Sequence, residues 1–368
     1  MRHAACSCGQ CVAPTQLSLG DAHSCARMSN GSVWCWGTDV DGRSGRAAGT
    51  LADGVAHQVR AANGQAMTGF VEVAAGGSFT CARRHDGTVW CWGANDSGQL
   101  GVAGSGTHRP VMVEGIQDAT TLVAGGAHAC AVLSDDTVVC WGENGSGQLA
   151  NGGADRPTPV GVDGVTGVVD IVSGDAHTCV VLSGGGVKCW GAADDRLGTP
   201  TPSQGTVEDV VGVNNPLAIS ARGRHTCVIG AGDEVPFCWG HNDSGQLGAD
   251  VAAASTYSAT KVNGVGSTLV LASGGGHNCA LIINNTVMCW GLADNGELGE
   301  GHSGVQATPR LVSGVTAPSA LAAGGHHTCA LVAGNQVKCW GDDEVGQCGD
   351  GAPTSGADGQ IDTVVWEP

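Results

Sequence analysis

Short runs of apolar residues, separated by turns rich in Gly, Asn and Asp, recur along the whole chain about every 50 residues. In the last repeat, Ala330-Leu331-Val332 precedes a polar turn and Val337-Lys338-Cys339-Trp340 follows it. A third run lies upstream of such a pair, as at 171–174, and a fourth lies further upstream, as at 158–162. Runs of this length between turn-forming residues predict strands, and no helical period competes with them. We therefore expect four strands per repeat, with the outermost strand first.

The tripeptide Cys-Trp-Gly defines the period. It occurs seven times, in steps of 56, 49, 49, 49, 51 and 50 residues. Four short strands in about 50 residues are typical of one propeller blade. The sequence therefore predicts an all-β fold, a seven-bladed β-propeller over residues 17–368, with a Cys-containing segment at 1–16 before it.

The two ends of the chain are expected to close the ring. The first repeat begins near Leu17 and lacks an outermost strand upstream of it. Residues 361–366, Ile-Asp-Thr-Val-Val-Trp, look like an outermost strand whose repeat is missing. We predict that this C-terminal strand completes the first blade, since a closed ring leaves no open edge.

Each Cys-Trp-Gly cysteine has a partner upstream, at a distance of ten residues in six repeats and eleven in the fifth. The residues midway between them tolerate a left-handed backbone, which predicts a three-residue hairpin loop. Across such a hairpin the two Cα atoms lie roughly 4.5–5.5 Å apart, which a disulfide accepts. We predict disulfides, with metal thiolates and free core thiols as alternatives, for Cys25–Cys35, Cys81–Cys91, Cys130–Cys140, Cys179–Cys189, Cys227–Cys238, Cys279–Cys289 and Cys329–Cys339.

Four cysteines lie outside this pattern: Cys6, Cys8, Cys11 and Cys348. Cys348 replaces a Leu of the repeat, and we expect it to pair with one of the N-terminal three, taken as Cys11, to join the chain ends. The N-terminal cluster could instead bind a metal, or be the remnant of an upstream module.

Composition restricts the setting and the partners. The net charge is −18 and no basic run is present, so nucleic acid is a poor partner. No apolar stretch is long enough to span a membrane, and no signal peptide is visible. Eighteen cysteines favour an oxidising compartment, so we expect an extracellular, periplasmic or cell-surface monomer.

Two further sets of residues repeat. Histidine stands two residues before the first Cys in six repeats, and Phe79 stands there in the second. A residue repeated in nearly every blade serves the blade, so we expect these His, and the Trp of each Cys-Trp-Gly, to be structural.

The loops after Cys-Trp-Gly carry acidic residues, and equivalent loops of a propeller lie on one face. These residues are Asp39, Asp41, Asp96, Glu143, Asp194, Asp195, Asp243, Asp294, Glu297, Asp342, Asp343 and Glu344. They predict an acidic face that attracts a basic partner, or that binds Ca²⁺ weakly. The alternative is that these residues only stabilise the turns and keep the protein soluble. No other cofactor is expected.

The segments in which blades differ are candidate contact surfaces. They are residues 42–69, 199–216 and 229–236.

The repeat resembles the regulator-of-chromosome-condensation repeat family. The shared pattern is Gly-Gly-x-His-x-Cys-Ala-Leu, a turn, Val-x-Cys-Trp-Gly and Asn-x-x-Gly-Gln-Leu-Gly, whose last part reads Asn95-Asp96-Ser97-Gly98-Gln99-Leu100-Gly101 here. The paired cysteines are similar to those of secreted or surface proteins of bacteria. The resemblance implies a propeller with a binding role. The nuclear founder of the family promotes nucleotide exchange on a small GTPase and docks on chromatin, and another member is a secreted inhibitor of β-lactamase. This chain lacks the founder's basic tail.

The sequence thus predicts a non-catalytic protein-interaction platform, secreted or on a bacterial surface. The alternatives are regulation of a small GTPase, a propeller enzyme, and a carbohydrate-binding propeller that would use Trp34, Trp90 or Trp366, the Trp outside the motif. No nucleophile elbow, phosphate loop or His-Glu-x-x-His motif supports catalysis.

Overall fold

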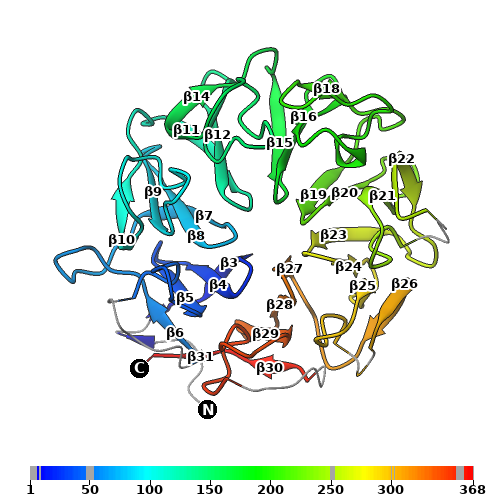
Figure 1. Cartoon of the computed structure of the whole chain (residues 1–368). Helices are drawn as coiled ribbons and strands as arrows, with labels where there is room; N and C mark the ends of the chain where they lie inside the picture. The colour runs from blue at the N-terminus through cyan, green and yellow to red at the C-terminus, as the bar shows by residue number, and fades with distance from the viewer. Residues whose placement is uncertain are drawn as a thin grey trace.

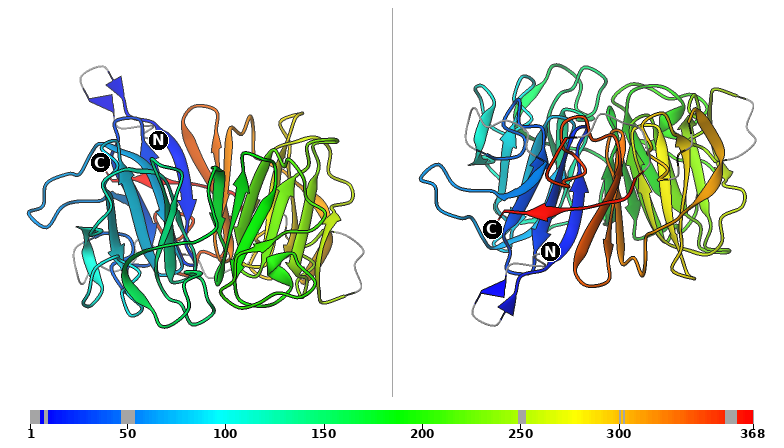
Figure 2. Two further views of the ribbon diagram at one scale, coloured as in Figure 1. Left: turned by 90° about the horizontal axis from the view of Figure 1, so that it is seen from above. Right: turned by 90° about the horizontal axis from the view of Figure 1, so that it is seen from below.

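The computed structural model describes residues 6–7, 10–46, 54–248, 253–299, 301, 303–353 and 360–367. Seven antiparallel sheets stand around a central axis, which confirms the seven-bladed propeller (Figure 1). A strand pair, β1 (Cys6–Ser7) and β2 (Gln10–Cys11), stands out from one face of the disc at blade one (Figure 2). Because adjacent blades cover each other's faces, each apolar strand buries both of its sides.

Each blade contains an innermost strand, the two strands of the disulfide hairpin and an outermost strand, in this order along the chain. From blade one to blade seven these are β3 (Pro14–Leu19), β4 (His23–Met28), β5 (Val33–Gly37) and β6 (Val55–Gln58); β7 (Phe70–Ala75), β8 (Phe79–Arg84), β9 (Val89–Gly93) and β10 (Thr107–Met112); β11 (Ala119–Ala124), β12 (His128–Leu133), β13 (Val138–Gly142) and β14 (Arg156–Gly161); β15 (Val168–Ser173), β16 (His177–Leu182), β17 (Val187–Gly191) and β18 (Glu208–Asp209); β19 (Ala218–Arg222), β20 (His225–Ile229), β21 (Pro236–His241) and β22 (Ser255–Lys261); β23 (Thr268–Ser273), β24 (His277–Ile282), β25 (Val287–Leu292) and β26 (Val305–Val312); and β27 (Ala320–Ala323), β28 (His327–Val332), β29 (Gln336–Gly341) and β30 (Asp362–Thr363). A 3-10 turn, η1 (Asp195–Leu197), follows β17.

The predicted order of strands within a blade was wrong. The segment at 158–162 falls on β14, which pairs with the hairpin strand before it and not with the one after it. Blade one therefore has its own outermost strand, β6. The reason is connectivity, since a short return to the neighbouring hairpin strand is available immediately after each Cys-Trp-Gly loop.

The two chain ends do close the ring, in a different way from the one expected. Asp362 and Thr363 form β30, the outermost strand of blade seven. The chain then crosses to blade one, where β31 (Val365–Trp366) pairs in parallel with β6 as a fifth strand. Trp366 packs edge-on against the rings of Trp34 and Trp36. The C-terminal residues thus join the last blade to the first.

The disulfide hairpins have the predicted register. In every blade the two cysteines are directly opposite, for example Cys130 and Cys140, and their Cα atoms are 4.1 Å apart. All seven predicted hairpin disulfides are formed. Left-handed residues close the turns, including Gly31 (φ 76°) and Asp136 (φ 63°). Gly or a short polar residue is needed there because other side chains clash in this conformation.

Cys348 is a buried free cysteine, so the predicted disulfide with Cys11 is not formed. Its side chain occupies the place of the Leu that fills this position in other blades, such as Leu149, and its Sγ lies 3.7 Å from the carbonyl oxygen of Asp342. A small apolar group suffices for that packing role. Cys8 lies outside the described residues, and Cys6 faces Cys11 in the β1–β2 pair.

The core lies between blades. The Trp of each Cys-Trp-Gly is fully buried, and six of the seven donate a hydrogen bond from Nε1 to a backbone carbonyl of the preceding blade. Trp141, for example, donates to the carbonyl of Gln99 over 3.0 Å. Trp92 is the exception, and its Nε1–H has no partner among the described residues. The motif therefore joins neighbouring blades, as expected for a structural Trp.

Candidate functional site

The loops that follow Cys-Trp-Gly share one internal design. The Asn side chain of the Asn-x-x-Gly-Gln-Leu-Gly pattern accepts a hydrogen bond from the backbone five residues later, as Asn95 does from Leu100 over 2.9 Å. The Gln side chain accepts from the backbone two residues earlier, as Gln99 does from Ser97 over 3.0 Å. Both bonds recur in blades three and five, so the residues between them point outward from a rigid support there. Blades four and six have Ala193 and Ala293 at the position of the Asn.

Three of the twelve predicted acidic-face residues are buried in this loop design. Asp39 and Asp343 take the place of the Asn and accept from the backbone of Ser44 and Cys348. Glu297 takes the place of the Gln and accepts from the backbone of Asn295 over 2.8 Å. A carboxylate offers the same acceptor oxygen as the amide it replaces. The prediction that these three lie on a binding surface was therefore wrong.

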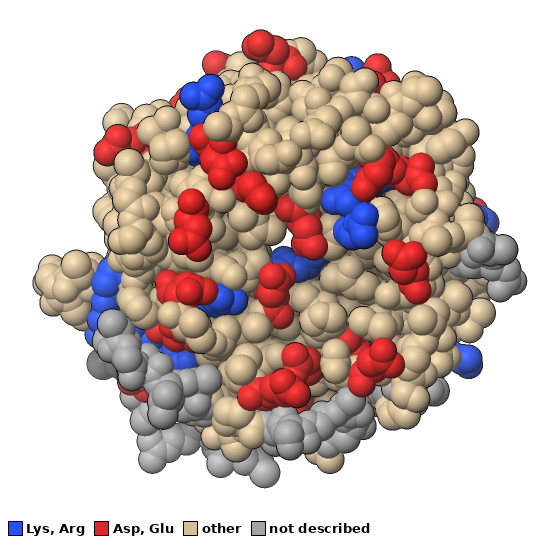
Figure 3. Space-filling model, in the orientation of Figure 1, with Lys and Arg blue, Asp and Glu red and all other residues tan. Residues whose placement is uncertain are grey.

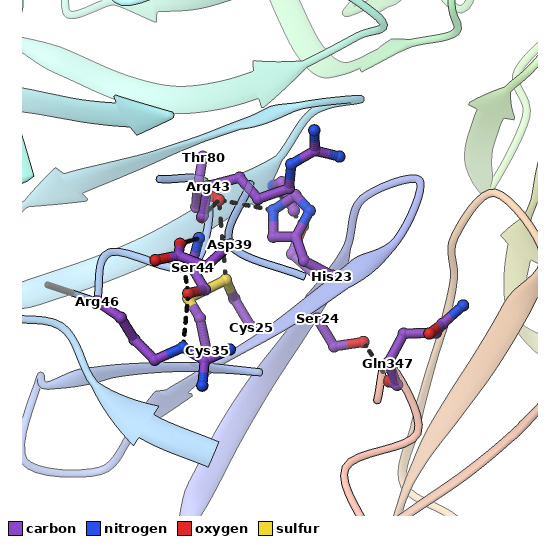
Figure 4. Close-up of a disulfide and its surroundings, with 12 residues drawn as sticks. His23, Ser24, Cys25, Cys35, Asp39, Arg43, Ser44, Arg46, Thr80 and Gln347 are labelled. Carbon is purple, nitrogen blue, oxygen red and sulfur yellow. Dashed lines mark hydrogen bonds between the residues drawn. A yellow bond between two sulfur atoms is a disulfide. The ribbon is translucent and has the colours of Figure 1, made fainter. Parts of the chain in front are cut away.

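Figure 4 shows how Asp39 is held. Its Oδ1 accepts from both the backbone N–H and the hydroxyl of Ser44, at 2.9 and 2.6 Å, and Arg46 donates to the Ser44 hydroxyl at 3.1 Å (Figure 4). Its Oδ2 lies 3.3 Å from Nδ1 of His108. The first blade thus replaces the Gln-Leu pair of the loop with charged and hydroxyl groups that satisfy one another.

The other nine carboxylates are at least partly exposed. They are Asp41, Asp96, Glu143, Asp194, Asp195, Asp243, Asp294, Asp342 and Glu344. Carboxylates are spread around the central opening on the face seen in Figure 3. Several of them also close their own turns, as Asp294 does by accepting from Gly304 over 2.8 Å. Turn chemistry and a negative surface potential therefore coexist on this face.

The sector between blades four and five is partly neutralised. Asp194 caps η1 and accepts two hydrogen bonds from the guanidinium of Arg196, at 2.7 and 2.8 Å. Burial acts to raise the pKa of Asp194, but the bonds and charge of Arg196 outweigh it and lower that pKa. Glu143 differs, because burial and the nearby charge of Asp155 raise its pKa. The least compensated charge therefore lies outside this sector, at residues such as Asp96 and Glu344.

Three residues that the sequence pattern did not predict as a site, Asp21, Asp175 and Arg222, lie at the mouth of the central channel. Arg222 stands where other blades have a Gly such as Gly20 or Gly76, and its guanidinium reaches across the axis from blade five. It donates to the carbonyl of Leu19 over 2.9 Å and to Asp21 over 2.7 Å. Asp175 is exposed to solvent, but the surrounding protein removes part of its hydration, and this desolvation raises the pKa of its carboxyl. All three residues replace a Gly of the Gly-Gly-x-His pattern, and this difference from the other blades could have identified them in the sequence.

Arg222 closes one end of a cavity of about 420 Å³ that runs between the innermost strands. Nearly all of its side chain is buried, and it also lies 3.4 Å from the carbonyl of Ala75 in blade two. A single side chain thus ties blade five to blades one and two across the axis.

The recurring His form a hydrogen-bonded ring between blades. His23 Nε2 lies 2.8 Å from the hydroxyl of Thr80 in the next blade, and that hydroxyl donates to the carbonyl of Arg43. The ring nitrogen must therefore donate to Thr80. The same holds at His225, whose Nε2 faces the carbonyl oxygen of the Asn278 side chain over 3.0 Å.

Burial holds these His neutral. It lowers the pKa of His128, His225 and His277 to about 4 and that of His327 to about 3. In blade two Phe79 replaces the His, and in blade three Ala129 replaces the residue that would bond to it, such as Thr80 or Thr178 in other blades. Both partners of the hydrogen bond are therefore absent between these two blades. Among the described residues, no group of three or more His, Cys, Asp or Glu side chains is placed to hold a metal ion. The structural interpretation of the His accounts for every one of these contacts.

The three Trp outside the motif are half-buried, and two of them bond within their own turns. Trp34 and Trp90 donate from Nε1 to Ser32 and Thr88, two residues before each. Trp366 packs on Trp34, and Arg84 lies over Trp90. In the part of the chain that the structure describes, no helix is long and apolar enough to cross a bilayer.

Comparisons with known proteins agree with this architecture. The RCC1-like domain model matches residues 48–360, and the RCC1 repeat model matches residues 15–43. Among solved structures, human WBSCR16 superposes with a TM-score of 0.78 at 21% identity, covering 90% of this chain and 93% of that one. Yeast RCC1 (Prp20), solved with Kap60, gives 0.76 at 20% identity, covering 95% and 84%.

Curated relatives match over shorter stretches. Human E3 ubiquitin-protein ligase HERC2 is 33% identical over 106 residues, which are 28% of this chain and 2% of that protein. The X-linked retinitis pigmentosa GTPase regulator homolog of Caenorhabditis elegans is 36% identical over 87 residues, 23% of this chain and 6% of that protein. The matched stretches are thus small parts of those relatives. With the family model covering most of its length, this chain belongs to the RCC1-like domain family.

Proposed function

We propose that this propeller is a non-catalytic platform that binds a basic partner protein through its acidic face. The observation that carries the proposal is the set of outward-pointing carboxylates on loops whose backbones are fixed by repeated hydrogen bonds. A fixed array of like charges attracts an oppositely charged surface and loses little entropy when it binds. The net charge of −18 adds long-range attraction.

We place this function outside the cytoplasm, at a cell surface or in a secreted protein. Seven disulfides between neighbouring strands are typical of an oxidising compartment. One protein of similar fold, Prp20p from Saccharomyces cerevisiae, binds the proteins Gsp1p and histones. A rigid disk with differing loops is suited to that kind of recognition.

The test uses an octalysine peptide as the basic probe, with binding followed by fluorescence anisotropy. Replacing Asp96→Asn, Asp243→Asn and Glu344→Gln together should weaken binding by at least about threefold at low salt, because each exposed charge pair contributes roughly 0.2–1 kcal/mol. Raising the salt concentration should weaken the wild type further.

The matched control is the triple variant Asp86→Asn, Asp135→Asn and Asp136→Asn. It removes the same number of charges from the hairpin turns at the other ends of the strands. Asn already occupies the equivalent turn positions in another blade, at Asn284 and Asn285. Equal weakening by both triple variants would contradict a specific acidic face, and so would the absence of any weakening.

Regulation of a small GTPase is the second candidate. It is favoured by the names of two relatives, a GTPase regulator homolog and the Gsp1p-binding Prp20p. A pull-down with immobilised small GTPases, loaded with either nucleotide, separates the two candidates. Retention of the propeller on a GTPase that survives the acidic-face triple variant would favour this second function.

A further inference from the structure

Blade five contains a pocket that arises from its departures from the repeat. Its hairpin is one residue longer, with eleven residues separating Cys227 and Cys238. Glu234 takes a left-handed backbone (φ 55°) and its N–H donates to the carbonyl of Gly230 over 3.1 Å. The widened turn stands away from the loop at 212–216, and a cavity of about 410 Å³ lies between them.

The walls of this pocket are largely apolar. They are formed by the side chains of Val213, Pro216, Val228, Phe237 and Ala259. Gly230, Gly232 and Asp233 form the remaining side. Both sequence segments singled out as candidate contact surfaces, 199–216 and 229–236, therefore meet at one place.

Gly230 explains why the space is open. The residue three positions after the first cysteine is Met28, Arg84, Leu133, Leu182, Ile282 or Val332 in the other six blades. In blade three, Leu133 lines the equivalent groove together with Ile116 and Val139. Blade five has no side chain at this position, and the Phe237 ring takes part of that space, since a Cβ on Gly230 would lie 2.8 Å from the ring. The chain thus omits a side chain that is apolar in five other blades and is Arg84 in blade two.

The surroundings of the pocket indicate what fills it. Leu217, Val211 and Tyr257 are exposed nearby, with Leu217 at 59%. Asp233 pairs with Lys261, while Glu234 next to it is exposed and has no cationic partner in the described chain. An apolar guest is favoured in the pocket, and a cation is favoured beside Glu234.

We propose that this pocket binds a short segment of a partner protein, with a Leu-sized side chain in the cavity between Val213, Pro216 and Phe237 and a Lys or Arg beside Glu234. The pocket adjoins the hairpin turn of blade five, at the ends of the strands remote from the Cys-Trp-Gly loops. The inference is therefore independent of the acidic face. It gives the platform a second contact surface with a different chemistry.

The experiment titrates acetyl-Gly-Leu-Lys-Gly-amide into the full ¹⁵N-labelled chain and follows the backbone amides of Gly230 and Gly232 by NMR. The expected result is concentration-dependent shifts of these amides, with much smaller shifts for the peptide in which Ala replaces Leu. Replacing Lys by Glu in the peptide, or Glu234→Gln in the protein, should weaken binding by about two- to fivefold. Asp86→Asn, an equal charge change in the turn of blade two, should not.

The first filling variant is Gly230→Leu, which places a side chain against the Phe237 ring and into the pocket and should abolish the shifts. Ala259→Leu fills the pocket from the opposite wall and serves if the first variant does not fold. Unshifted amides in the wild type, shifts that persist in a folded filled variant, or equal binding of the Ala peptide would each overturn the proposal. Octalysine binding should be unchanged in both filled variants. A failure of the pocket proposal can therefore be distinguished from a failure of the acidic-face proposal.

Discussion

The hydrogen bond between His128 and Thr178 allows the account of the His ring to be tested quantitatively. Nε2 of His128 lies 2.9 Å from the Thr178 hydroxyl, and both residues are fully buried. His128→Phe alone should leave the Thr178 hydroxyl with only the Ser173 hydroxyl, 3.2 Å away, beside it, and Thr178→Ala alone should leave Nε2 of His128 without its partner. A buried polar group that loses its hydrogen-bond partner lowers the unfolding free energy by roughly 1–3 kcal/mol. The Phe ring itself fits, since Phe79 occupies the same site beside Gly76 that His128 occupies beside Gly125.

The double variant His128→Phe/Thr178→Ala reproduces the Phe79–Ala129 combination that the chain already contains between blades two and three. It should therefore be less destabilised than the sum of the two single variants, by about 1 kcal/mol or more. The assay is guanidinium unfolding with disulfides intact, followed by Trp fluorescence and far-UV circular dichroism. Strictly additive losses would refute the inference that His128 is present for the hydroxyl of Thr178 in the next blade.

Three other perturbations test separate parts of the structure. Arg222→Gly introduces the residue found at this position in the six other blades. It should lower the unfolding free energy by about 1.5–3 kcal/mol, because the charged hydrogen bonds to Leu19 and Asp21 are lost. Unchanged guanidinium unfolding would contradict a stabilising contact across the axis. The buried His have folded-state pKa values below the unfolded value of 6.5, so the unfolded chain binds more protons than the folded chain. The free energy of unfolding should therefore fall as pH drops from about 6.5 towards 4. The fall should be shallower in the double variant His128→Phe/Thr178→Ala, and equal slopes would argue against a contribution of His128. Cys130→Ala/Cys140→Ala should cost about 2–3 kcal/mol in the same unfolding assay, and a loss well below 1 kcal/mol would show that the strand pairing is sufficient without the bond.

The repeat made the fold predictable, since a spacing that recurs seven times specifies seven equivalent units. The hairpin register followed from the cysteine separation together with turn residues such as Gly31 and Asp136. The order of strands did not follow, because an apolar run such as 158–162 has the same composition whichever neighbour it pairs with. Only the three-dimensional path decides that β14 turns back to its own hairpin.

The candidate site was only partly predictable for a related reason. Asp39, Asp343 and Glu297 look like surface acids in the sequence, but they occupy positions where the loop needs an acceptor oxygen. Arg222 was missed because its partners, Leu19 and Asp21, lie about 200 positions away in the chain and meet it only across the axis. The sequence distinguished the segments 199–216 and 229–236 from the other blades, but only the structure shows that they meet at one pocket.

Intact mass after alkylation of protein from its native host tests both the hairpin disulfides and the proposed function outside the cytoplasm. Without reduction, we expect no label on any of the fourteen hairpin cysteines, and label on Cys348 only after unfolding because this thiol is buried. Burial also raises the pKa of the Cys348 thiol, which slows its reaction further. Full alkylation of all eighteen cysteines without reduction would contradict the proposed compartment and would favour the GTPase-regulator alternative.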